Sequence, residues 1–186
     1  VGHMYEAATA HFLATNERTL IDVAIRNADL IYDICITQGK DFYPGHQEIE
    51  IGLVKLYRAT GNKNYLDLAK HFLDMRGMGK RDYLTEEEAE VPWETAPYSQ
   101  DHIPVTQQTE AVGHSVRANY MYAAMADIAA LAGDKEYLQA VDAIWENVVA
   151  KKIYLTGGLG AGSHGESYVV NYDLPNKSYA ETCAAI

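Results

Sequence analysis

The stretch 60–66 reads TGNKNYL and separates two segments in which apolar residues recur at helical spacing. One apolar stripe covers residues 49–57, and the next begins at once over residues 65–72. Gly61 is typical of a helix stop, because glycine readily takes the left-handed backbone that ends a helix. Two helices joined by so short a turn pack antiparallel, and the stretch therefore predicts a helical hairpin.

The same construction occurs twice more, in the stretches 15–21 (TNERTLI) and 132–138 (AGDKEYL), with Leu20, Tyr65 and Tyr137 in equivalent places. The three turns are unequally spaced, which argues against a solenoid of fixed period. We expect a single all-α domain over residues 1–186, built of antiparallel helical hairpins. The longest helix is predicted over residues 107–132, and Cys35 is predicted to be a small core residue on the buried face of a helix over 19–37.

The composition excludes several classes of protein. Lysine and arginine total 15 against 26 acidic residues, for a formal net charge of -11. The sequence therefore has no basic stripe of the kind that binds a phosphate backbone, and no nucleic-acid partner is expected. No run of eighteen apolar residues occurs, and no membrane span is expected. Two cysteines cannot form a disulfide framework. The N-terminal segment lacks the layout of a signal peptide, and we expect a cytoplasmic location.

Two histidines lie at positions from which they could line a cavity. His46 precedes the third helix and is either a site residue or a surface or capping histidine. His114 lies on a mostly apolar stripe and is either a satisfied core histidine or a ligand contact, with small neighbours leaving room. The loop 78–106 carries Trp93, Tyr98 and His102, which suit either contact with a sugar ring or attachment of the loop to the domain surface.

The stretch 157–185 reads GGLGAGSHGESYVVNYDLPNKSYAETCAA. Its Gly-x-Gly-x-x-Gly pattern formally matches a dinucleotide-binding fingerprint, but the following β-prone segment is broken by Pro175 where a helix is needed. The glycines more plausibly form a loop or short β segment that presents Glu166 at a cavity. Glu181 and Cys183 would share a face in an extended segment and could supply half of a tetrahedral zinc site, although Glu-x-Cys also arises by chance.

Several long motifs in order carry a resemblance to a known family. They are PGHQEIE (44–50), QTEAVGHSVRA (108–118), GGLG (157–160), GES (165–167), YDLPN (172–176) and ETCAA (181–185). Together they resemble glycoside hydrolase family 127, the β-L-arabinofuranosidase family. The resemblance implies that the chain is an internal piece of an (α/α)6 catalytic barrel, which β-sandwich domains follow in the family.

The family's chemistry is a retaining hydrolysis in which a zinc-bound cysteine thiolate is the nucleophile. By resemblance, Glu166 is the general acid and base, and Glu181 and Cys183 are two of four zinc ligands. His46 and His114 match positions that contact the sugar, as does His3 unless Gly2-His3-Met4 is the remnant of an expression tag. The expected partner is a plant glycan containing L-arabinofuranose.

Nothing in the chain matches the family's nucleophilic cysteine. Because retaining hydrolysis needs a nucleophile and an acid on either side of the scissile bond, we expect these 186 residues alone to be inactive. Two alternatives remain open at this point: another (α/α)6-barrel sugar enzyme, of the unsaturated glucuronyl hydrolase or epimerase type, and a non-catalytic scaffold of helical hairpins.

Overall fold

A computed structural model describes residues 1–78 and 96–185 of the chain. This part contains six α-helices, and the expected all-α class is confirmed: α1 (Gly2–Thr15), α2 (Ile21–Tyr32), α3 (Ile49–Thr60), α4 (Lys63–Met75), α6 (Ser115–Ala132) and α7 (Lys135–Lys151). Short turns complete it: the π-helical η1 (Asp33–Thr37) and the 3-10 turns η2 (Val105–Gln107) and η3 (Thr182–Ala184). Among the described helices, none combines the length and hydropathy that crossing a bilayer requires.

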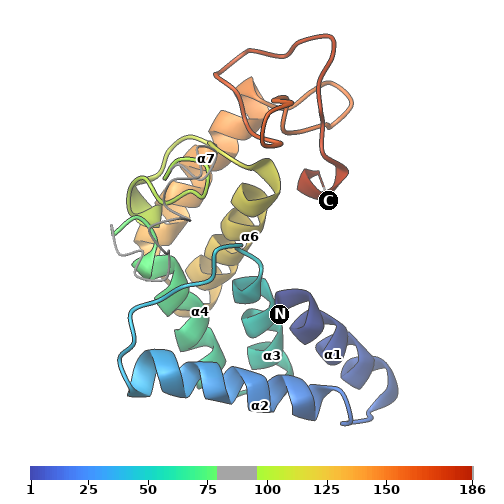
Figure 1. The fold of residues 1–186 in the computed structure, drawn as a ribbon, viewed down its shortest axis with the longest axis vertical. Helices are drawn as coiled ribbons and strands as arrows, with labels where there is room; N and C mark the ends of the chain where they lie inside the picture. The colour runs from blue at the N-terminus through green and yellow to red at the C-terminus, as the bar shows by residue number, and fades with distance from the viewer. Residues whose placement is uncertain (79–95, 186) are drawn as a thin grey trace.

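Local chemistry at the turns forms the hairpins. Gly61 ends α3 with φ 71°, and the Asn62 side chain accepts a hydrogen bond from the Asn64 N–H to start α4. Gly133 ends α6 with φ 67°, and the Asp134 side chain caps α7 in the same way. In Figure 1, α3 and α4 run antiparallel, as do α6 and α7. The first pair differs, because α1 packs chiefly against α3 while α2 contacts both α1 and α4.

Tyrosines at the turns tie one hairpin to another. The Tyr65 hydroxyl donates to Asp29 at 2.9 Å, and the Tyr137 hydroxyl donates to Asp74 at 2.8 Å. Both rings are 1% exposed, whereas Leu20, at the equivalent place in the first turn, is 37% exposed. The predicted equivalence therefore holds for the two tyrosines and is wrong for Leu20.

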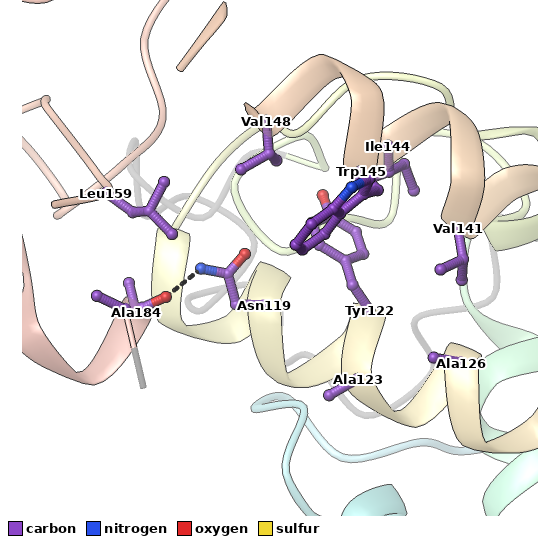
Figure 2. A pocket seen from close by; sticks show the side chains of 11 residues that line it. Asn119, Tyr122, Ala123, Ala126, Val141, Ile144, Trp145, Val148, Leu159 and Ala184 are labelled. Atoms are coloured by element: carbon purple, nitrogen blue, oxygen red, sulfur yellow. Dashed lines mark hydrogen bonds between the residues drawn. The ribbon is translucent and has the colours of Figure 1, made fainter. Parts of the chain in front are cut away.

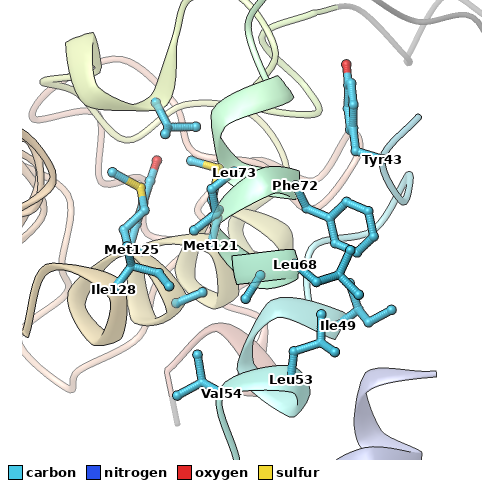
Figure 3. Close-up of a cluster of buried hydrophobic side chains, with 14 of the residues drawn as sticks. Tyr43, Ile49, Leu53, Val54, Leu68, Phe72, Leu73, Met121, Met125 and Ile128 are labelled. Atoms are coloured by element: carbon cyan, nitrogen blue, oxygen red, sulfur yellow. The ribbon is translucent and has the colours of Figure 1, made fainter. Parts of the chain in front are cut away.

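The core lies where α3, α4 and α6 meet (Figure 3). Leu53 from α3, Leu68 and Phe72 from α4, and Met121 from α6 have no exposed surface. Each such side chain contributes about 1.5–3 kcal/mol through burial. Cys35 is 2% exposed, and burial raises the pKa of its thiol to about 11, which confirms it as a core residue.

The predicted helix over 107–132 was wrong at its start, since α6 begins only at Ser115. Gly113 has φ 70° and lies so close to the backbone of Tyr98 that a Cβ would meet its carbonyl oxygen at 2.5 Å. The Gln108 side chain donates to the carbonyls of Gln100 and Ile103. Contacts with the preceding loop thus hold the segment before Ser115 out of the helix.

Candidate active site

Rings from three parts of the chain form a continuous cluster next to the start of α6. His3 on α1 packs edge-on against Tyr120 with ring centroids 5.8 Å apart, and His46 lies 6.0 Å from the same tyrosine. His46 also lies 6.1 Å from His114, which in turn contacts Tyr98 at 5.5 Å. The three histidines suggested by the sequence are therefore brought together. Tyr120 joins them, although none of the sequence motifs pointed to this tyrosine.

His114 is the N-cap of α6. Its Nδ1 accepts a hydrogen bond from the Arg117 N–H, so that in the neutral ring Nε2 carries the proton. Nε2 lies 3.3 Å from Oε2 of Glu166 and can donate to it. Burial lowers the pKa of His114, with Arg117 adding to the effect, and burial likewise lowers the pKa of His46.

Glu166 is held at both its backbone and its carboxylate. Its φ is 50°, in the left-handed region that few non-glycine residues adopt. Its carbonyl oxygen accepts two hydrogen bonds from Ser115, from the backbone N–H at 3.0 Å and from the hydroxyl at 2.8 Å. The Tyr179 hydroxyl donates to Oε1 at 3.0 Å. The side chain remains 39% exposed, so a ligand can reach the carboxylate.

Glu181 and Cys183 lie at η3 and contact each other. The thiol donates to the Glu181 carboxylate, which lowers the pKa of Glu181 and raises that of Cys183. The turn is tied to α6, because Asn119 donates to the Ala184 carbonyl at 2.5 Å (Figure 2). Asn119 also accepts from the Tyr168 hydroxyl at 2.7 Å. The expectation that the two side chains share a face agrees with this contact.

The thiol and carboxylate at η3 fit two of the four ligands of a tetrahedral zinc site. Within residues 1–78 and 96–185, no group of three or more histidine, cysteine, aspartate or glutamate side chains gathers closely enough to hold a metal ion.

The sequence of the loop after α4 suited either contact with a sugar or attachment to the domain surface, and the described part of the loop contains residues of both kinds. Tyr98 contributes a ring to the site through its contact with His114. Asp101 instead fastens the loop to the domain, accepting from the Tyr43 hydroxyl and from the Gly77 N–H, each at 2.6 Å. Trp93 lies outside the described residues.

Comparison with known proteins places the chain among the glycoside hydrolases. It is similar to a solved GH127 β-L-arabinofuranosidase from Geobacillus stearothermophilus T6, at TM-score 0.88 and 46% identity, over 99% of this chain and 30% of that one. A second GH127 β-arabinofuranosidase structure matches at TM-score 0.85 and 51% identity, over 98% of this chain and 27% of that one.

One curated relative and one family model agree with the structures. The chain is 34% identical over 197 residues to the non-reducing end β-L-arabinofuranosidase of Bifidobacterium longum subsp. longum, covering all of this chain and 30% of that protein. The family model described as β-L-arabinofuranosidase, GH127 catalytic domain, matches residues 1–186. The chain belongs to this family, and it spans about 30% of the length of these relatives.

Proposed function

We propose that these 186 residues form part of the (α/α)6 barrel of a retaining β-L-arabinofuranosidase, with Glu166 as general acid and base. The observation that carries the proposal is the setting of this carboxylate. It is partly exposed, receives donors from His114 and Tyr179, and borders a cluster of rings. The substrate class is a glycan that ends in L-arabinofuranose, as the names of the relatives suggest.

In this function Glu166 first donates a proton to the leaving oxygen and then removes one from the attacking water. His114 orients the carboxylate through its Nε2–H and Tyr179 through its hydroxyl. His46 and His3, with Tyr120 between them, present a surface of rings and polar atoms to the sugar.

Glu181 and Cys183 would hold zinc in the complete enzyme, with the remaining ligands and the nucleophile supplied by other parts of the protein. Zinc supplies a positive charge that keeps coordinated thiols ionised. The Cys183 thiol, which now donates to Glu181, would release its proton on binding the metal. Cys35 is unsuited to act as the nucleophile, because it is buried and its thiol pKa is raised to about 11.

The test compares full-length protein with its Glu166→Gln variant on an aryl β-L-arabinofuranoside, with the product anomer followed by NMR. We expect the variant to lose activity by a factor on the order of 10²–10⁴, and the first-formed arabinose to keep the β configuration. Glu17→Gln, an exposed change in the first hairpin turn, is the matched control and should act as the parent does. An inverted product, or full activity in Glu166→Gln, would refute the proposal.

A further inference from the structure

We propose that Ser115 is a positioning residue that sets the direction of the Glu166 carboxylate, an inference that rests on the proposed function. Ser115 is the first residue of α6 and has no exposed surface. Its backbone N–H and its hydroxyl both donate to the Glu166 carbonyl, at 3.0 Å and 2.8 Å. The N–H at the first position of a helix has no partner within the helix, so it is free to bind this loop.

Adjacent residues at the start of α6 hold the two ends of Glu166. His114 faces the carboxylate at 3.3 Å, while Ser115 fixes the carbonyl of the same residue. The backbone of Glu166 is in the left-handed region, with φ 50°. Because that conformation is unfavourable for a side-chain-bearing residue, it persists only where surrounding contacts hold it. The Ser115 hydrogen bonds are such contacts.

Gly160 lies directly against the Ser115 hydroxyl. A Cβ at residue 160 would lie 2.4 Å from Oγ and 3.0 Å from Cβ of Ser115. The glycine also has φ 74°, so both space and backbone favour glycine there. One function of the glycine-rich loop is therefore to let residue 160 approach Ser115 and keep its hydroxyl directed at Glu166.

A general acid must lie within hydrogen-bond reach of the oxygen that it protonates, and a misplacement of about 1 Å costs on the order of 10²-fold in rate. The rate falls only for substrates whose leaving group must be protonated as it departs. A leaving group that departs without a proton should be insensitive to the direction of Glu166. Dependence on the leaving group therefore separates a positioning role from a general loss of structure.

The experiment measures kcat/KM of full-length protein on methyl and dinitrophenyl β-L-arabinofuranosides. For Ser115→Ala we expect a fall of about tenfold on the methyl glycoside and less than about twofold on the dinitrophenyl glycoside. Ser115→Thr, which keeps a hydroxyl, should recover most of the loss. Equal losses on both substrates, or none on the methyl glycoside, would overturn the inference.

A second pair of variants guards against misfolding of Ser115→Ala. Gly160→Ala places a Cβ against the Ser115 hydroxyl and should reproduce the leaving-group-selective loss. Gly133→Ala is the matched control: residue 133 also has positive φ, 67°, but open space around it, so it bears the backbone strain without touching Ser115. Equal behaviour of the two glycine variants would contradict the inference.

Glu166→Gln, measured on the same two substrates, distinguishes failure of the Ser115 positioning role from failure of the proposed function. If it shows the selective loss and Ser115→Ala does not, only the positioning role fails. If Glu166→Gln shows no such loss, the proposed function itself fails.

Discussion

Tyr179 donates its hydroxyl hydrogen to Oε1 of Glu166 across 3.0 Å, and this bond raises the pKa of the phenol. The two residues are thirteen positions apart, in a segment without regular secondary structure around Tyr179. Tyr179 itself is 47% exposed. The bond therefore orients the carboxylate and contributes little to the core.

Replacing Tyr179 with phenylalanine should lower kcat about three- to tenfold, because one hydrogen bond from a neutral donor to the partly exposed carboxylate is lost. The melting temperature should change little, since about half of the Tyr179 surface is exposed. Steady-state kinetics and thermal denaturation of full-length protein check both expectations. Tyr172→Phe, at another exposed tyrosine of the same stretch, is the control and should leave kcat unchanged. A Tyr179→Phe enzyme with parental kcat would argue against an orienting role.

Asn119 links α6 to the turn that carries Cys183, through hydrogen bonds to Ala184 and Tyr168. Asn119→Ala should free this turn and weaken zinc binding by about 10- to 100-fold, the usual cost of removing a residue that orients a metal ligand. Competition with a chromophoric chelator measures the affinity of full-length protein. Asn64→Ala, at an exposed position on α4, should leave zinc affinity unchanged. Unaltered affinity in Asn119→Ala would contradict the proposed ligand role of the turn.

Partly buried histidines predict how stability depends on pH. Burial lowers the pKa of His46, His71, His102 and His114 from the ordinary value of 6.5. The unfolded chain therefore binds more protons than the folded one below that pH, and stability is full above about 6.5 and falls as the pH drops through the folded-state values. The melting temperature, measured from pH 7.5 to 5, should decline below about 6.5. His71→Gln should reduce the decline, and a flat profile would contradict this account.

Much of the fold follows from local sequence, because the signals that begin and end its helices are local. Gly61 stops one helix, as predicted, and the next residue, Asn62, caps the helix that follows. The start of α6 could not be predicted in this way. It depends on contact between Gly113 and Tyr98 and on the loop bonds of Gln108, which periodicity does not report.

In the candidate site, too, the residues with local sequence signals were predicted and those that depend on distant contacts were not. Residues whose chemistry is distinctive, such as Glu166, Glu181 and Cys183, were identified from motifs, and their catalytic and zinc-binding roles stay predictions. Ser115 and Asn119 were missed, because each acts through a partner about fifty or more residues away. Their spacing of four on one face of α6 is a weak signal that the sequence does contain.

The central claim, that Glu166 is the acid and base of a retaining hydrolysis, is tested most directly by chemical rescue. In the Glu166→Ala variant of full-length protein, turnover of dinitrophenyl β-L-arabinofuranoside should be limited by the missing base. Added azide, which needs no base, should restore turnover and give β-L-arabinofuranosyl azide, identified by NMR. No acceleration by azide, or an azide product of inverted configuration, would contradict the claim.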